Sequence, residues 1–244
     1  MSDTSKRFAP GWPLWLFVLA FMPILLSLGY WQLQRADEKQ MLQAQMDTNR
    51  SALAQNLLEL DQLEDRAWRP LQLQGEFDPE HIWLLDNRTR DGKAGVEVLQ
   101  LFRDQLSAQP IVINRGWVAW PARRQLPSID TPKGILQLDA EAVPQAEQGF
   151  TLGQQADATG WPRLITQVDL QRFAEEAAEP NLLSWSARLK IGSPAALTLS
   201  WPPLPTTASK HTAYAVQWFA LALALLALFI WAGLRPEPRR NTQP

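Results

Sequence analysis

The sequence contains no cysteine, and this absence removes several kinds of chemistry at once. Disulfide bonds, thiolate catalysis, zinc ribbons, iron–sulfur ligation and covalent attachment of haem through thioethers all need that residue. Histidine is scarce, with two copies, and 23 basic residues nearly balance 25 acidic ones. The net charge of -2 gives no electrostatic reason to expect nucleic acid as a partner.

Motifs of the common enzyme classes are also absent from the sequence: it has no phosphate loop, dinucleotide glycine fingerprint, HExxH or GxSxG elbow. We therefore expect a chain that is not an enzyme. His81 opens a predicted strand, where a lone histidine is more often structural or solvated than catalytic. The acidic residues Glu175, Glu176 and Glu179 are expected to form a solvated helix face and not a metal site.

Two long apolar runs are present, and five of the 12 tryptophans lie near their ends. Residues 12–33 and 211–234 are each long enough to cross a bilayer, which takes about 20 apolar residues in a helix. A cleaved signal peptide is disfavoured for the first run, because no small-residue cleavage site follows it. We predict two transmembrane helices whose interfacial anchors are Trp12, Trp15, Trp31, Trp218 and Trp231.

The direction of the helices follows from the charges beside the second run. It is followed by Arg235, Arg239 and Arg240, whereas only Lys210 immediately precedes it. Positive residues concentrate on the cytoplasmic side, so the C-terminus is predicted to be cytoplasmic and, with two spans, the N-terminus as well. A presequence rich in Arg and Ser and poor in acidic residues is not seen. This favours a bacterial inner membrane, with the central region in the periplasm.

The central region begins with a segment that favours a helix. Residues 34–60 are rich in Gln, Ala, Glu and Leu and contain neither Gly nor Pro, so the first helix is expected to continue out of the membrane as a stalk. Its apolar residues either contact a partner or, as the commoner arrangement, pack on the chain's own domain.

After residue 67 the pattern changes to short runs in which apolar and polar residues alternate, as in Leu71-Gln-Leu-Gln-Gly-Glu-Phe77. Alternation of this kind predicts half-buried strands, separated by turn-rich pieces such as 86–92. One short helix is expected at 169–178, with Asp169 as its N-cap. The predicted strands are 71–77, 81–86, 95–102, 110–117, 135–143, 163–168, 182–189 and 196–201.

The predicted fold class is an α+β membrane protein, in which two transmembrane helices flank a mostly antiparallel β-rich periplasmic domain, either a sandwich or a barrel. Its parts are a cytoplasmic N-terminus at 1–11, transmembrane helices at 12–33 and 211–234, a stalk helix at 34–66, the β-rich domain at 67–210 and a cytoplasmic tail at 235–244.

His211 stands at the outer mouth of the second apolar run, and helical spacing brings Tyr214 and Trp218 onto its side. An imidazole at a membrane edge beside aromatic rings is a sensible axial ligand for haem iron. An ordinary residue of the interfacial belt is the other interpretation, and spacing alone favours it. His81 falls in the β-rich region, where we expect no comparable aromatic setting.

Three separated segments carry a family resemblance. They are Leu28-Gly-Tyr-Trp-Gln-Leu-Gln-Arg-Ala-Asp-Glu-Lys39, Ile111-Val-Ile-Asn-Arg-Gly-Trp-Val118 and His211-Thr-Ala-Tyr-Ala-Val-Gln-Trp-Phe219. In order and placement they resemble the signatures of the Surfeit locus protein 1 family, membrane proteins that assist assembly of haem-copper cytochrome c oxidase. Beside the histidine this chain has Ser209-Lys210 and Thr212, where the family typically has asparagine and leucine.

The resemblance implies an assembly factor that helps haem a to be delivered to, or retained in, the catalytic subunit of the oxidase. Its partners would be that subunit, other oxidase assembly or haem a synthesis proteins, and membrane lipid. The competing hypothesis is a membrane-tethered periplasmic structural or sensory β domain without a cofactor. The candidate haem-binding residues are His211 as the iron ligand, Tyr214, Trp218, Trp31 and Arg35.

A second candidate set, Asn114, Arg115, Gly116 and Trp117, is expected to form a strand-ending turn. Gly116 can adopt a backbone conformation that is closed to other residues. Arg115 can pair with a haem propionate or with an acidic side chain of its own domain. A structural role and a role in contacting a partner are equally open for this turn.

Overall fold

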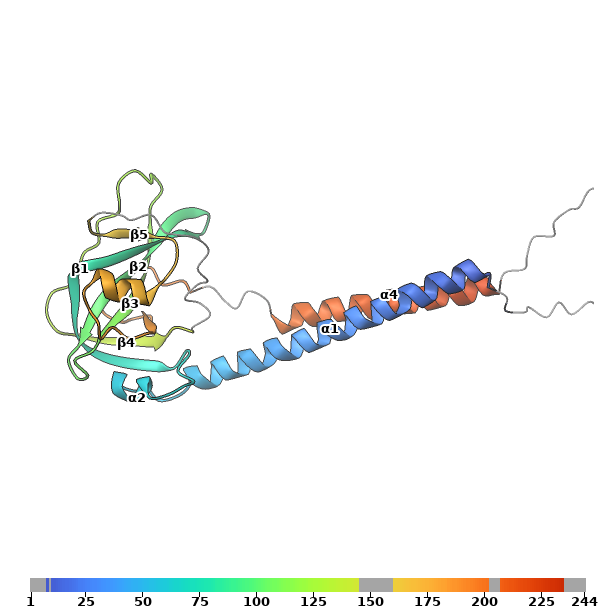
Figure 1. Ribbon diagram of the computed structural model, residues 1–244, viewed down its shortest axis with the longest axis horizontal. Coiled ribbons are helices and arrows are strands. Elements are labelled where there is room, and N and C mark those ends of the chain that lie inside the picture. The colour runs from blue at the N-terminus through green and yellow to red at the C-terminus, as the bar shows by residue number, and fades with distance from the viewer. Residues whose placement is uncertain (1–7, 9, 145–159, 202–206, 235–244) are drawn as a thin grey trace, which may run out of the picture. The chain divides into compact units, whose positions relative to one another are not determined.

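The computed structural model describes residues 8, 10–144, 160–201 and 207–234. It divides into two compact units (Figure 1). The first unit, the helix pair, is Met1–Ala44 together with Pro203–Pro244, and the second, the β-sheet domain, is Gln45–Pro202.

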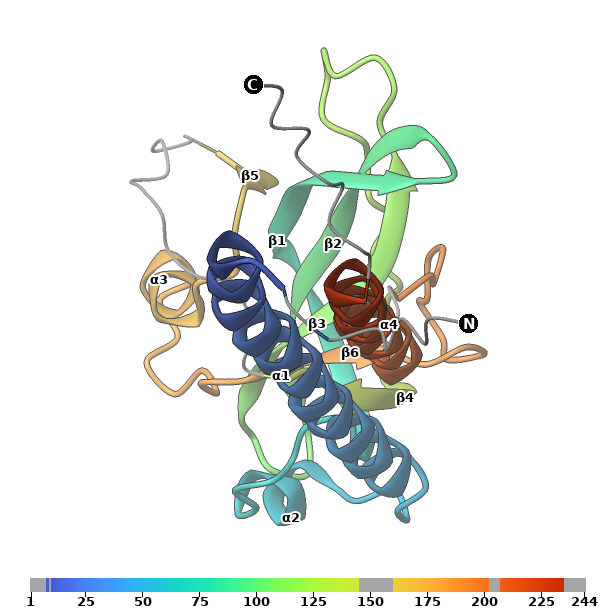
Figure 2. The same ribbon diagram turned by 90° about the vertical axis from the view of Figure 1, so that its right-hand side faces the viewer.

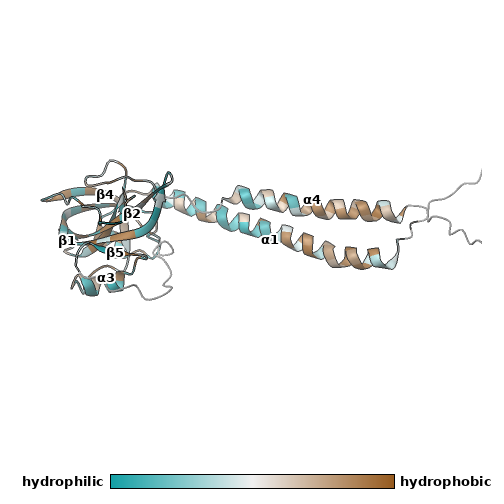
Figure 3. Ribbon diagram, turned by 90° about the horizontal axis from the view of Figure 1, so that it is seen from above, coloured by the Kyte–Doolittle hydropathy of each residue, from teal (hydrophilic) through white to brown (hydrophobic). Residues whose placement is uncertain are grey.

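The helix pair consists of most of α1 (Trp12–Arg50) and all of α4 (Ala208–Gly233). Both helices are long and apolar enough to cross a membrane, and only 11% and 17% of their most apolar windows is buried. A core helix of a soluble domain would be mostly buried instead. Figure 3 shows the hydrophobic colour along α4 and the first half of α1, and hydrophilic residues along the later part of α1.

The two helices of the pair lie side by side and run antiparallel (Figure 2). Near the start of α1, the ring of Trp15 packs edge-to-face on Phe229, with centroids 4.8 Å apart. Further along, Gly29 faces Phe219, and a Cβ built on Gly29 would lie 2.7 Å from that ring. Since any larger residue there would meet the ring, Gly29 permits this close approach of the helices.

The predicted stalk at 34–66 is wrong in its extent, because α1 ends at Arg50. The side chain of Asn49 donates to Asp65 Oδ1 at 3.1 Å and to the carbonyl of Ala67 at 3.0 Å. The chain then turns into a new short helix, α2 (Leu57–Asp61), which begins with a capping box formed by Asn56 and Glu59. Helix propensity depends on local residues only, so it could not predict these bonds to residues 16 and 18 positions later.

The β-sheet domain is a mixed sheet of β1 (Pro70–Arg90), β2 (Lys93–Asp104), β3 (Pro110–Ala119), β4 (Leu136–Ala142), β5 (Arg163–Ile165) and β6 (Ser186–Leu189). Its pairings run in a closed circuit, β1–β2–β3–β6–β4–β1, and β5 pairs with β1 as well. The pairings β3–β6 and β1–β5 are parallel, and the other four are antiparallel.

The first two predicted strands and residues 86–90 of the predicted turn belong to one strand, β1, and only the last two residues of that turn form a turn. Its register against β2 shifts between Phe77 and Ile82 and again between Leu85 and Arg88, so the turn-forming residues make bulges and do not end the strand. The hairpin turn is the pair Asp91-Gly92, with φ of 47° and 73°. The predicted strand at 196–201 is reduced to one bridge between Thr198 and Trp117.

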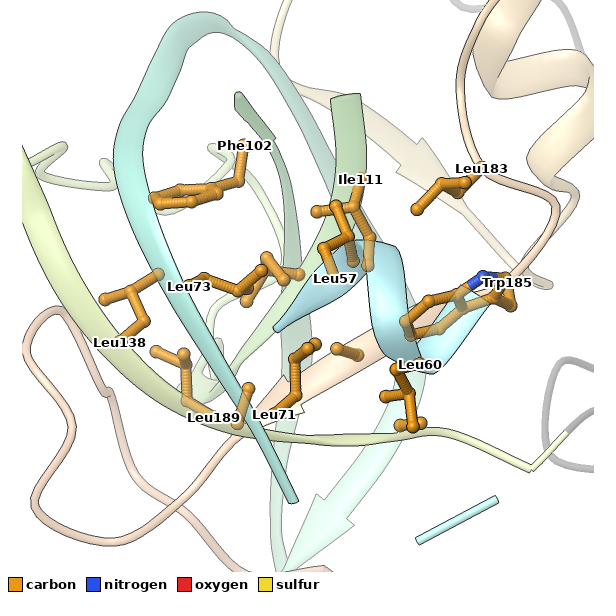
Figure 4. Close-up of a cluster of buried hydrophobic side chains, with 14 of the residues drawn as sticks. Leu57, Leu60, Leu71, Leu73, Phe102, Ile111, Leu138, Leu183, Trp185 and Leu189 are labelled. Atoms are coloured by element: carbon orange, nitrogen blue, oxygen red, sulfur yellow. The ribbon is translucent and has the colours of Figure 1, made fainter. Parts of the chain in front are cut away.

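The short predicted helix is confirmed as α3 (Leu170–Glu176), and the side chain of Asp169 caps it by accepting from the backbone N–H of Arg172. Phe173 on this helix stacks on Trp83 of β1, with centroids 4.2 Å apart. A separate core cluster surrounds α2, where Leu57 and Leu60 meet side chains of the sheet and Trp185 (Figure 4).

The burial of α2 gives a test of this core. Leu60 is fully buried, whereas Leu58 on the same helix is 44% exposed. We expect Leu60→Ala to lower the free energy of unfolding by about 2–5 kcal/mol, because it leaves a cavity, and Leu58→Ala to change it by less than about 1 kcal/mol. Chemical denaturation of the full-length protein in detergent, followed by tryptophan fluorescence, measures both. Equal losses would mean that α2 is not packed in this way.

Candidate functional site

His211 lies in the first turn of α4, and its ring is half-buried. Its Nδ1 atom is 2.8 Å from Oε1 of Gln32 on α1, a hydrogen bond between side chains 179 residues apart in the sequence. The bond belongs to the helix pair, where both residues lie in one compact unit. The structure therefore joins the candidate iron ligand to a partner on the other helix.

The sequence prediction missed Gln32. A signal was present, because a polar side chain near the end of an apolar run is costly to bury unless it has a partner. Gln32 also stands within the first of the three segments that carry the family resemblance. What sequence could not supply was the register of α1 against α4, which decides that Gln32 meets His211.

The aromatic candidates lie on the surfaces of the two helices. Tyr214 is 54% exposed and Trp31 46% exposed, while Trp218 is half-buried. The guanidinium of Arg35 lies 5.7 Å from the ring centroid of Trp31, and its Nη1 pairs with Glu38 at 2.7 Å. The structure thus places Arg35 beside Trp31 and His211 beside Gln32. The rings of Trp31 and Tyr214 remain exposed on the outer surface of the helix pair.

The second candidate set does not form a strand-ending turn, and that prediction is wrong. All four residues lie inside β3, where the register against β2 steps from Gly116 to Asn114 and skips Arg115. Arg115 is therefore the extra residue of a β-bulge. Gly116 has φ of +119°, and a Cβ there would lie 2.8 Å from the carbonyl oxygen of Thr198. The expectation of a special glycine backbone is confirmed.

The bulge turns Arg115 into the domain, where it is only 2% exposed. Its Nη1 donates to Oε1 of Gln100 at 2.6 Å, its Nε donates to the carbonyl of Ala195 at 3.0 Å, and the guanidinium lies 5.1 Å from the ring centroid of Phe77. Burial lowers the pKa of Arg115, against the opposing effect of Asp130. Its bonding partners are thus neutral groups of its own domain.

The neighbours of Arg115 are also held by their own domain. Asn114 donates to the buried carboxylate of Glu97 at 2.9 Å, and Glu97 also accepts from Arg90 at 2.7 Å. The indole of Trp117 donates to the carbonyl of Arg88 at 2.7 Å. These contacts tie the bulge of β3 to the β1–β2 hairpin, which favours the structural interpretation of all four residues.

His81 has an aromatic setting after all, so that expectation is wrong. Its ring lies edge-to-face on Trp161 at 4.8 Å, and Trp161 contacts Trp83 in the same way. Nδ1 of His81 is 3.0 Å from Oδ2 of Asp78. Burial raises the pKa of Asp78, but its bonds to His81, the backbone of Glu80 and Arg103 together lower it below 3.8. This histidine therefore belongs to the packing of the β-sheet domain.

The acidic residues on α3 and just after its end do not form a solvated face, although Glu175 is exposed. Glu179 pairs with Arg103 on β2. Oε2 of Glu176 accepts from the indole of Trp83 at 2.7 Å, and its Oε1 pairs with Arg163 and Arg172. Burial raises the pKa of Glu176, but these hydrogen bonds outweigh it and hold the pKa below 4.5. Among the described residues no metal-binding group of carboxylates and histidines occurs.

The lowered pKa of Glu176 predicts a specific acid sensitivity. Its charged form stabilises the fold above the unfolded pKa of 4.5, and that contribution is lost as the pH falls through the lower, folded pKa. We expect Glu176→Gln to be less stable at pH 7 and to lose less of its remaining stability between about pH 5 and pH 3 than the unsubstituted protein. Melting temperatures across that range measure the effect.

The exposed neighbour Glu175 supplies the control for this test. Glu175→Gln should follow the unsubstituted protein at every pH. If Glu176→Gln kept the full acid dependence, the ion pairs with Arg163 and Arg172 would not contribute to stability.

The fold and the site define this chain as a β-sheet domain attached to a pair of helices suited to a membrane, with a histidine bonded across that pair. The chain belongs to the SURF1 family, whose model matches residues 19–223. The match includes α1 from residue 19 onward, the β-sheet domain and α4 as far as residue 223. The family resemblance carried by the three sequence segments is confirmed.

Relatives of similar length support the same assignment. A SURF1-like protein of Rickettsia felis is 25% identical over 225 residues, which cover 88% of this chain and 94% of that protein. A SURF1-like protein of Rickettsia conorii is 23% identical over 219 residues, covering 85% of each chain. One from Monosiga brevicollis is 23% identical over 270 residues, covering 99% of this chain and 98% of that protein.

Proposed function

We propose that this chain is a non-enzymatic assembly factor for haem-copper cytochrome c oxidase, which holds haem a for the catalytic subunit. The observation that carries the proposal is His211, a half-buried imidazole at the start of an apolar helix, bonded to the neighbouring helix and placed in a segment typical of the SURF1 family. Membership of the family is consistent with a role in oxidase assembly.

The residues of the helix pair fit a haem. Because Nδ1 of His211 is bonded to Gln32, the other nitrogen, Nε2, is the atom that would coordinate the iron. Exposed rings at Trp31 and Tyr214 suit the apolar faces of a porphyrin, and Trp218 lies one turn beyond Tyr214. Arg35, with a side chain 48% exposed, is the proposed partner of a propionate. The bound haem a would be the group that the oxidase needs for its own chemistry. This chain would only hold the haem until it is transferred.

The proposed location is a bacterial inner membrane, with α1 and α4 as the two spans, both termini in the cytoplasm and the β-sheet domain in the periplasm. The tail at 235–244, which lies outside the described residues, holds Arg235, Arg239 and Arg240, and such residues favour the cytoplasmic side. His211 would then lie at the periplasmic edge of the bilayer, beside the oxidase subunits that it serves.

Reporter fusions test this topology. Alkaline phosphatase, which is active only in the periplasm, should be active when fused after Trp120 and inactive when fused at the C-terminus. Green fluorescent protein at the C-terminus should fluoresce, because it folds in the cytoplasm. The reverse pattern would place His211 on the cytoplasmic side and would rule out the proposed location of the haem site.

Substitution of the histidines tests the ligand. We expect His211→Ala to abolish or shift the visible haem spectrum of protein co-expressed with the haem a synthesis enzymes, and to lower the haem content of the oxidase. The amount of protein in the membrane should not change. His81→Gln is the matched control, since His81 is bonded within the β-sheet domain, and it should leave both readings unchanged. An unchanged spectrum in His211→Ala would reject the ligand role.

A second candidate function is a membrane-tethered structural or sensory β domain that holds no cofactor. It draws support from the bulge of β3, where Asn114 bonds to Glu97 and Arg115 bonds to Gln100 and Ala195, all of them groups of the β-sheet domain. The two functions separate on the spectrum of the purified protein, because only the first predicts haem.

A further inference from the structure

The bond between His211 and Gln32 lies on the facing sides of the helix pair. Four residues after Gln32 comes Ala36, which is 6% exposed, and four residues after His211 comes Ala215, which is 1% exposed. Residues four apart share one face of a helix. Gln32 and His211 therefore lie on the two helix faces that meet between α1 and α4, and both side chains are half-buried there.

The bond also fixes which nitrogen of the imidazole carries the proton. Oε1 of the Gln32 amide is an acceptor only, so Nδ1 of His211 donates to it at 2.8 Å. A neutral imidazole has a single N–H, and Nε2 is then left with its lone pair free. Nε2 is also on the edge of the ring away from Gln32. The lone pair that can bind a metal is thus not used by the bond to Gln32.

We propose that Gln32 is a positioning residue that locks His211 in its Nδ1–H tautomer and so presents Nε2 as the ligand atom. The proposal rests on the proposed function for its role in haem binding, but the tautomer itself is a property of the haem-free protein. A partner on the second nitrogen commonly orients a ligating histidine and raises its basicity, and its loss weakens metal affinity roughly 10- to 100-fold.

Nitrogen-15 magnetic resonance of the haem-free, full-length protein tests the tautomer directly. The chain has only two histidines, so ring-labelled protein in lipid nanodiscs gives a simple spectrum, and His81→Gln identifies the signals of His211. We expect a protonated Nδ1 and an unprotonated Nε2. In Gln32→Leu, which is similar in size and has no acceptor, this pattern should be replaced by an Nε2–H form or by a mixture of the two tautomers.

Two further variants separate positioning from simple packing. Gln32→Glu keeps an oxygen acceptor and should therefore keep the Nδ1–H tautomer. If substitutions at this position acted only by loosening the helices, Gln32→Glu would lose the tautomer as Gln32→Leu does. Gln34→Leu removes an exposed glutamine two residues along the same helix and should match the unsubstituted protein. An Nε2–H tautomer in the unsubstituted protein, or an unchanged tautomer in Gln32→Leu, would overturn the proposal.

Haem binding supplies the second reading. We expect Gln32→Leu to keep a histidine-ligated spectrum but to lose haem to an excess of apomyoglobin about 10- to 100-fold faster, and Gln32→Glu to restore slow release. If His211→Ala left the spectrum unchanged while Gln32→Leu still changed the tautomer, the proposed ligand role would fail and the positioning of His211 would stand. Equal release rates in Gln32→Leu and Gln34→Leu would reject a role for Gln32 in retention.

Discussion

The β-sheet domain depends on one strand, β1, whose 21 residues must find hydrogen-bond partners along both edges. Its first residues pair with β4, its later residues pair with β2, and Trp83–Leu85 also pair with β5. At Gly75 the strand pairs on both sides at once, and a Cβ there would lie 1.9 Å from the carbonyl oxygen of Arg103. Because a buried backbone group without a partner is costly, this double pairing closes the circuit of strands.

Buried polar side chains then determine the details of the sheet. Arg115 cannot remain in the interior without acceptors, and it finds them in Gln100 and in the carbonyl of Ala195. Glu97 and Glu141 are likewise buried and bonded, the latter to Arg188 at 2.7 Å. Since removing one partner leaves the other buried and unsatisfied, such groups favour a single register over alternatives. The bulge in β3 places Arg115 where these two acceptors lie.

Local patterns predicted the local structure, and long-range contacts account for the errors. The apolar runs became α1 and α4, and Asp169 caps α3 as its type and place indicate. The end of α1 at Arg50 was not predictable, because the partners of Asn49 come at least 16 residues later. The same holds for the circuit of strands, in which the parallel pairing of β3 with β6 joins distant segments. In the candidate site, the family resemblance pointed to His211, whereas Gln32 depends on how two helices are registered.

The separation of 179 residues between Gln32 and His211 has a consequence for the timing of biosynthesis. The ribosome completes α1 and the whole β-sheet domain before it makes the first turn of α4. A chain that stops short of His211 holds one half of the helix pair and lacks the imidazole. The histidine site is therefore assembled after the β-sheet domain, and only a chain translated past His211 can present it.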